Sequence, residues 1–317
     1  MIAATLFCAG LVYAAVRLDG PTGAFDRALD AFHRDPEATP DDLSGRLLSV
    51  SGHGRADYWR VAAGMVADHP LLGAGAATFN RNWLADRPVP HQARDAHNLY
   101  LETVAALGPI GLAVLLLALA PPLVAFGRVR GDPVGAALAG VYAAFLVHAA
   151  VDWDWEIPLL ALGGLVCGTG LVARGRVPGG PTAVRLPGPL VVGLGCCVVA
   201  IGLAAHIGNR ALASAQHELA TGRPERALAR ARTARTWMPW SAEPWQLIGQ
   251  AHLAAGRDAK ARASLLEAAR RDPGAWSTWL SLASITPSSE AALARAEALN
   301  PLSSTVSEVR EATRTDP

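Results

Sequence analysis

Two side chains in a long polar segment, Arg55 and His97, have the chemistry to act at a phosphate group and a hydroxyl. An arginine guanidinium stays charged, and its planar fork binds phosphate oxygens in pairs. A histidine has an unperturbed pKa of about 6.5, so it can take a proton from a hydroxyl near neutral pH. Each also has an ordinary structural reading, Arg55 as a solvated helix residue and His97 as the neighbour of a helix cap. Four further candidates for substrate binding are Arg60, Asn98, His148 and Asp152.

These further candidates also have structural alternatives. Arg60 could extend its charged end toward lipid headgroups instead of a substrate. His148 and Asp152 are four residues apart, so on one helix they share a face. They are then either functional residues near a membrane span or a local hydrogen bond at the helix end. No metal site is predicted, because no known ligand pattern fits the spacing of His53, His69, His91 and His97.

Local patterns predict the elements that position these residues. Residues Arg55 to Asp68 predict an amphipathic helix, and Pro70 ends it. Its apolar positions recur at helical spacing: Tyr58, Val61, Ala62, Met65 and Val66. The Gly73-Ala-Gly75 stretch can take backbone conformations that are closed to other residues. A second helical run, Leu99–Ala106, follows His97 and continues toward an apolar segment.

The composition indicates a membrane protein. Of 317 residues, 51% are hydrophobic and 17% charged, with a net charge of +1, which argues against a disordered chain and against a nucleic-acid partner. A spanning helix needs about 20 apolar residues. Five runs are candidates, of which the first is marginal: Met1–Val16, Leu107–Phe126, Val134–Val151, Ile157–Ala173 and Pro187–Ala205.

Charge in the short loops predicts the orientation of these spans. Arginines lie in the loops 127–133 and 174–186, whereas the loop 152–156 is acidic and has none. The positive-inside rule places the arginine loops in the cytoplasm, so residues 17–106 and 208–317 are expected to be extracytoplasmic. Two alternatives concern the first run. It could be a signal peptide, although it lacks a basic start, or the chain could be the later part of a longer membrane protein.

Residues 208–317 read as a soluble repeat domain. Four residue types recur after 34 residues: Gly222 at Gly256, Ala227 at Ala261, Pro239 at Pro273 and Trp245 at Trp279. This is the period of the tetratricopeptide repeat, a helix–turn–helix unit. Pro301 comes only 28 residues after Pro273, so a shortened last repeat is expected to cap the stack.

Several motifs taken together resemble the O-antigen ligase/polymerase family. They are Gly-Arg55-x-x-x-Trp59, then Asp68-His-Pro-Leu-Leu-Gly73-x-Gly75-x-x-x-Phe79, then His97-Asn98-x-Tyr100, then Gly108-x-x-Gly111. The resemblance covers roughly residues 51–171, including His148 and Asp152. Members have more spans upstream, and a further functional arginine usually lies there, so a complete site is not assured in this chain.

The resemblance implies a membrane enzyme that moves a glycan from a polyprenyl-pyrophosphate carrier to an acceptor outside the cytoplasmic membrane. It assigns His97 to the acceptor hydroxyl and Arg55 to the pyrophosphate, with no cofactor and no metal. The implied partners are the donor, a glycan, lipid or protein acceptor, and membrane lipid. The repeat domain is expected to bind a protein or simply to cap the membrane domain.

The predicted fold class is therefore all-α. It comprises a transmembrane helix at 1–16, an extracytoplasmic loop at 17–106, four transmembrane helices within 107–207, and the repeat domain at 208–317. The rival function is a non-catalytic, membrane-anchored repeat scaffold for cell-envelope assembly. A transporter is a third alternative, but it predicts charges inside the spans, and the middles of the five runs carry none. The motifs do not separate a ligase from a polymerase.

Overall fold

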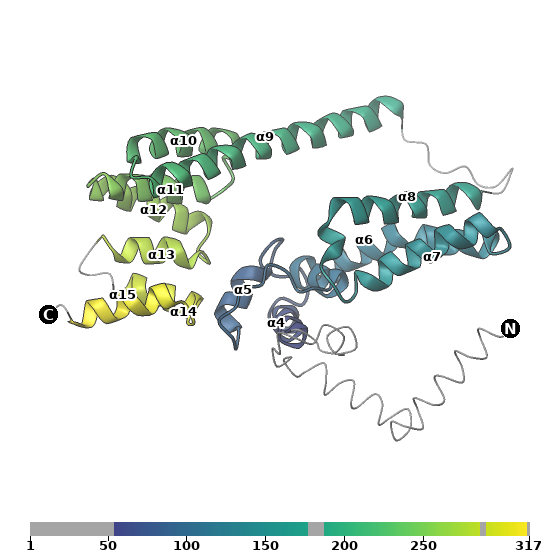
Figure 1. Ribbon diagram of the computed structural model, residues 1–317, viewed down its shortest axis with the longest axis horizontal. Helices are drawn as coiled ribbons and strands as arrows, with labels where there is room; N and C mark the ends of the chain where they lie inside the picture. Colours follow the sequence, from purple (N-terminus) through teal and green to yellow (C-terminus); the bar gives the residue numbers. More distant parts are fainter. Residues whose placement is uncertain (1–53, 177–186, 286–289, 316–317) are drawn as a thin grey trace, which may run out of the picture. The chain divides into compact units, whose positions relative to one another are not determined.

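The computed structural model describes residues 54–176, 187–285 and 290–315. Every regular element in these ranges is helical, which confirms the predicted all-α class (Figure 1). The chain divides into two compact units, one made of residues 1–83 and 93–176 and the other of residues 84–92 and 177–317. The predicted span Met1–Val16 and the first part of the predicted loop lie outside the described residues.

The first unit begins with α4 (Arg55–Asp68), whose bounds are those expected from the sequence. The helix buries Tyr58, Val61, Ala62 and Met65, so its predicted apolar face is the face that packs. It packs against α6 (Leu99–Val129), and α5 (Phe79–Asp86) lies between them in the chain. The predicted helix after His97 is thus the start of α6, which continues into the apolar segment.

Helix α6 is kinked where the polar loop meets the apolar segment. Gly108 has φ +68° inside the helix, a conformation that favours glycine. Three apolar elements follow: α7 (Pro133–His148), a short 3-10 helix η1 (Asp154–Glu156) and α8 (Pro158–Arg174). Helices α6, α7 and α8 lie side by side around a small core of Ala125, Val129, Tyr142 and Leu171 (Figure 1).

Two glycine positions bring the turn after α4 onto the kink of α6. A Cβ added to Gly73 would lie 2.4 Å from the carbonyl carbon of Ala106, and one added to Gly108 would lie 2.3 Å from the Leu71 carbonyl oxygen. Backbone hydrogen bonds fasten the contact, from Ala74 N to Ala105 O at 2.8 Å and from Gly75 N to Ala106 O at 2.9 Å. The glycines of the recognised motif are therefore needed for this close backbone approach.

The second unit is the stack of helical repeats. It contains α9 (Gly188–Ala220), α10 (Pro224–Trp237), α11 (Glu243–Ala254), α12 (Asp258–Arg271), α13 (Trp276–Ala283), α14 (Glu290–Leu299) and α15 (Ser304–Thr315). Gly222 and Gly256 occupy equivalent turns, with φ of +69° and +67°. Ala227 and Ala261 are both fully buried. The repeat predicted from the 34-residue shift is therefore present in the backbone.

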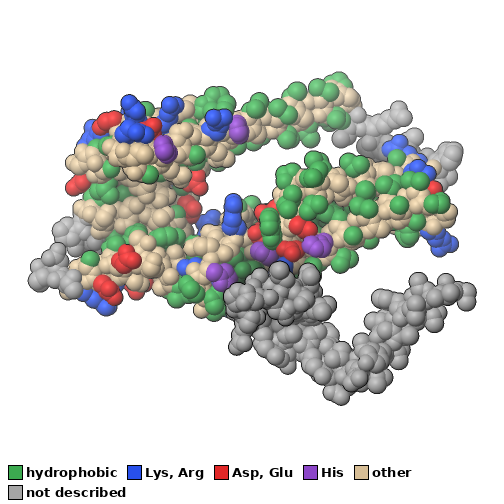
Figure 2. Space-filling model, in the orientation of Figure 1, with side chains coloured by type: hydrophobic (Ala, Val, Ile, Leu, Met, Phe, Trp, Pro, Cys, Tyr) green, Lys and Arg blue, Asp and Glu red, His purple; other side chains and the backbone are tan. Residues whose placement is uncertain are grey.

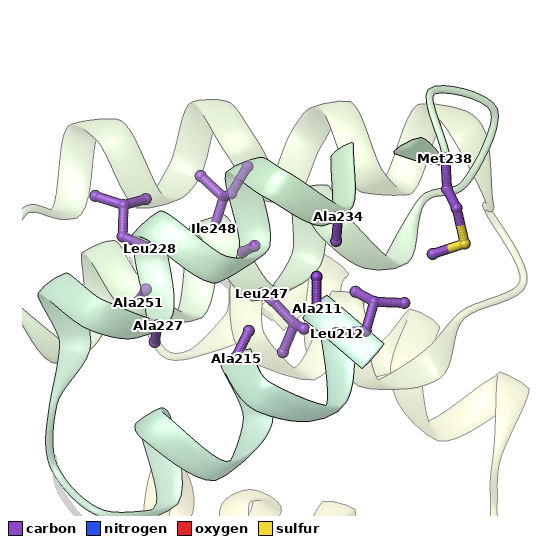
Figure 3. Packing of buried hydrophobic residues seen from close by; sticks show 11 residues of the cluster. Ala211, Leu212, Ala215, Ala227, Leu228, Ala234, Met238, Leu247, Ile248 and Ala251 are labelled. Carbon is purple, nitrogen blue, oxygen red and sulfur yellow. The ribbon is translucent and has the colours of Figure 1, made fainter. Parts of the chain in front are cut away.

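The core of the first repeats is built from small and branched apolar residues of α9, α10 and α11 (Figure 3). It contains Ala211, Leu212, Ala215, Ala227, Leu228, Ala231, Ala234, Met238, Leu247, Ile248 and Ala251. Helix α9 runs without a break through the predicted border at 207/208, and its last turns supply the first helix of the stack. In the same unit, the buried Arg87 donates to Asn300 Oδ1 at 2.8 Å, so residues 84–92 pack with the repeats.

Apolar surface is concentrated on the helices expected to contact lipid. Among the described residues, α6 and α9 are long and apolar enough to cross a membrane, at 31 and 33 residues. Helices α7 and α8 are apolar but shorter, at 16 and 17 residues. Hydrophobic side chains cover α6–α8 and the first half of α9, whereas charged side chains gather over the repeats (Figure 2). The chain is a membrane protein, and the five-span topology stays a prediction.

Candidate active site

Arg55 is the first residue of α4 and is paired with a residue far along the chain. Gly54 precedes it with φ +81°, so the chain enters the helix through a left-handed turn. Arg55 Nη2 donates a hydrogen bond to Asp152 Oδ2 at 2.7 Å, and the two side chains are 20% and 27% exposed. Asp152 lies in the loop between α7 and α8. The ion pair therefore brings two of the predicted site residues together at the same end of the helical bundle.

His97 lies in the loop before α6 in a strained backbone conformation, with φ +54°. Its Nδ1 lies 2.7 Å from Asp95 Oδ1, a contact that is an ion pair when the imidazole is protonated. The backbone N–H of His97 donates to the same oxygen at 3.0 Å. Non-glycine residues rarely take positive φ unless their surroundings hold them there. Asp95 holds both the backbone and the ring of His97.

Aromatic packing supports the other side of the His97 ring. The rings of Tyr58 and His97 have centroids 5.0 Å apart, and Tyr58 packs edge-on against Trp83 at 4.9 Å. Trp83 stacks in turn with Phe79 at 6.5 Å. Trp83 and Phe79 are fully buried, so α4 and α5 provide a rigid apolar wall behind the imidazole.

The electrostatics of this loop favour a charged pair. Burial by itself lowers the pKa of His97, but the contact with the Asp95 carboxylate and its charge outweigh burial, and the pKa is raised. Burial raises the pKa of Asp95, but the contacts with His97 and its charge outweigh it, and that pKa is lowered. The positive charge of Arg55 acts in the opposite direction on His97. The guanidinium and the imidazole are therefore within electrostatic reach of each other.

The loop that carries His97 is tied to α6 and α7. Asn98, a predicted substrate-binding residue, is the N-cap of α6, and its side-chain oxygen accepts from Leu101 N at 2.9 Å. The Ala96 backbone N–H donates to Glu102 Oε2 at 2.9 Å. Leu99 N donates to Ala149 O at 2.8 Å, which joins the start of α6 to the end of α7. Asn98 thus has a structural role in shaping the loop.

Two other predicted residues have partners outside this cluster. Arg60 lies on the exposed side of α4, with Nη2 at 3.4 Å from Asp57 Oδ1. For His148 and Asp152 a shared helix face was one expectation and a local hydrogen bond at the helix end the other; the shared face is absent, and Asp152 N donates to His148 O at 2.9 Å. Helix α7 ends at His148, and His148 Nδ1 lies 2.6 Å from Asp154 Oδ2. Because the helix ends there, the Asp152 side chain pairs with Arg55, whereas the His148 side chain contacts Asp154.

Sequence reasoning missed Asp95 as a site residue and treated Tyr58 only as a packing residue. Asp95 is 6% exposed, and its position two residues before His97 is the local signal that could have indicated a contact. The ring contact between Tyr58 and His97 carries no such signal, because the two residues come from different elements. In the described ranges, no group of three or more His, Cys, Asp or Glu residues is arranged to hold a metal ion.

Comparison with protein families agrees with the sequence motifs. Residues 1–116 match the family model described as O-antigen ligase, and residues 218–284 match the tetratricopeptide repeat. The first match includes Arg55, Arg60, His97 and Asn98 and ends before His148 and Asp152. No curated protein and no solved structure was found to match the chain. The resemblance noted in the sequence is confirmed as a match: residues 1–116 are similar to the O-antigen ligase family, and residues 218–284 to the tetratricopeptide repeat.

Proposed function

We propose that this protein transfers a glycan from a polyprenyl-pyrophosphate carrier to an acceptor hydroxyl at the outer face of the cytoplasmic membrane. The observation that carries the proposal is that Arg55 and His97 come from two separate motifs of the matched segment, with Arg55 paired to Asp152 and its charge acting on His97. Both are placed at the loop end of the apolar helices, where a lipid-linked donor would present its head group. The acceptor is a glycan, a lipid or a protein.

In this mechanism His97 is the general base. The contact of Nδ1 with Asp95 leaves Nε2 as the nitrogen that takes the proton from the acceptor hydroxyl. The freed oxygen forms a bond to the anomeric carbon of the glycan while the bond from that carbon to the pyrophosphate oxygen breaks. The sugar passes through an oxocarbenium-like state. His97 ends the step protonated, and Asp95 stabilises the charge it has gained.

Arg55 supports the other half of the reaction. The pyrophosphate leaves with the bonding electrons and gains negative charge, which the guanidinium stabilises through paired N–H donors. Asp152 holds the guanidinium in place from one edge. An arginine can neutralise a leaving pyrophosphate without a metal ion, because a guanidinium stays charged and binds phosphate oxygens in pairs.

Variants of the protein in its native membrane test this proposal, with glycan transfer read on a gel and membrane abundance measured in parallel. His97→Ala is expected to abolish transfer. Arg55→Ala is expected to cost roughly 3–4 kcal/mol of transition-state stabilisation, about a hundredfold or more in rate. Arg55→Lys should rescue little, because lysine lacks the planar fork. Arg128→Ala, an exposed arginine near the other end of α6, is the matched control and should behave as wild type, while Arg60→Ala tests the remaining candidate arginine on α4.

The rival function is a membrane-anchored scaffold, with which the repeat match is compatible. Such repeats present extended surfaces that bind partner proteins. The same assay separates the two functions. Normal transfer by His97→Ala at normal abundance would favour the scaffold. The scaffold would also be favoured if deletion of residues 208–317 stopped envelope assembly while His97→Ala and Arg55→Ala left transfer unchanged.

A further inference from the structure

Two leucines at the tip of the turn after α4 are exposed in an otherwise polar segment. Leu71 is 73% exposed and Leu72 is 77% exposed, among the most exposed large hydrophobic residues of the described chain. They follow Pro70 and precede the Gly73-Ala-Gly75 turn. Exposed apolar side chains that lie next to one another indicate a surface that another apolar phase covers.

The pair is held rigidly against the kink of α6. The position of a Cβ on Gly108 lies 2.3 Å from Leu71 O and 3.0 Å from the Leu72 carbonyl carbon, so the backbone of both leucines rests on the helix. The hydrogen bonds of Ala74 and Gly75 to α6 prevent the tip from folding back over its own side chains. The exposure of the two leucines is therefore built into the turn.

The level at which the pair rests on α6 indicates what covers it. Gly108 is the point where the exposed apolar surface of α6 begins, with Leu107 48% exposed, Ile110 65% exposed and Val114 63% exposed. Helix α6 is one of the two helices of the described chain that are long and apolar enough to cross a membrane. A lipid-facing helix surface of this kind is covered by acyl chains, and the leucine pair continues it.

We propose that Leu71 and Leu72 insert into the acyl-chain region of the leaflet that surrounds the start of the α6 span. The turn is then a lipid anchor that holds the end of α4 at the membrane surface. The transfer of a leucine side chain from water into acyl chains is favourable. The neighbouring Asp68 and His69 stay in the polar interface. This inference does not depend on the proposed glycan transfer.

Site-specific fluorescence in lipid vesicles tests the proposal. Leu72→Cys in a cysteine-free background is labelled with a small polarity-sensitive dye and reconstituted. Asp68→Cys, exposed at the end of α4, is the matched control. We expect dye at position 72 to emit at shorter wavelength than dye at position 68. A nitroxide attached near the top of the lipid acyl chain should quench the dye at position 72. Aqueous iodide should quench mainly the dye at position 68.

Two results would overturn the proposal. Equal quenching of both positions by iodide would show that the pair lies in water. Short-wavelength emission at position 72 without quenching by the lipid nitroxide would show that another protein segment covers the pair. Leu71→Cys repeats the measurement at the second leucine, so that a fault of one labelled variant does not decide the outcome.

Discussion

Arg55 Nη2 and Asp152 Oδ2 are joined by a 2.7 Å hydrogen bond although 97 residues separate them. The bond connects the start of α4 with the loop between α7 and α8, so it closes the polar segment over the end of the apolar helices. The charge-assisted pair fixes the guanidinium of Arg55 at this end of the apolar helices.

Removal of the Asp152 charge should weaken transfer through Arg55. Asp152→Asn keeps the shape of the side chain but replaces the ion pair with a hydrogen bond from the charged guanidinium to a neutral amide oxygen, a loss of about 1.5 kcal/mol or roughly tenfold in rate. Initial rates of glycan transfer in membranes provide the measurement. The control is Asp132→Asn, which alters another aspartate–arginine pair, with Arg174, and should leave the rate unchanged. An unaltered rate for Asp152→Asn would show that Arg55 needs no partner there.

The pH profile of transfer should depend on Asp95. A general base works only when its imidazole is neutral, and the pKa of His97 is raised by Asp95. The acid limb of the wild-type profile is therefore expected above about pH 6.5, the unperturbed value. Asp95→Asn removes the carboxylate, lowers the pKa of His97 and should move the acid limb to lower pH.

Rates measured across pH 5 to about 9 provide the test, because a purely structural role of Asp95 would lower the rate without moving the limb. Asp57→Asn, which alters the exposed pair with Arg60, is the matched control and should keep the wild-type profile. An acid limb at the same pH in wild type and Asp95→Asn would count against His97 as the base.

Gly73→Ala should destabilise the membrane unit. The new Cβ would lie 2.4 Å from backbone atoms of Ala106 at φ +70°, so it adds a steric clash to a left-handed conformation that costs about 1–2 kcal/mol by itself. Thermal unfolding in detergent should show a lower midpoint. The abundance of the variant in membranes, measured separately, should also be lower. Gly64→Ala on α4 is the control, because its Cβ meets nothing within 4 Å and should stabilise the helix by roughly 1 kcal/mol. Equal unfolding midpoints for Gly73→Ala and wild type would mean that the turn does not pack on α6.

The predicted topology places position 130 in the cytoplasm and position 258 outside. Arg130→Cys and Asp258→Cys, each in a cysteine-free background, should therefore react with a membrane-impermeant thiol reagent on opposite sides of the membrane. The arginines of the loops around 130 and 180 and the acidic loop 152–156 are the reason for this expectation. Reaction of both positions from the same side in sealed cells would refute the five-span arrangement.

Local patterns by themselves determined the helices around the site and the repeats. The bounds of α4 followed from its apolar spacing and Pro70, because an amphipathic face and a proline act within a few residues. The repeat followed from the 34-residue shift, which the matching turns at Gly222 and Gly256 bear out. The match of residues 1–116 to the O-antigen ligase family was indicated by the order of several motifs. Each of these signals is contained in neighbouring residues or in a fixed period.

Only the tertiary structure decided which side chains meet. Three contacts join residues from different elements: the ion pair of Arg55 with Asp152, the ring contact of Tyr58 with His97, and the close backbone contact of Gly73 with α6. His148 illustrates the reason: its spacing from Asp152 suggested a shared helix face, but α7 ends at His148 and each residue found another partner. Spacing predicts contacts within one helix, whereas contacts between helices depend on where each helix ends and how it packs.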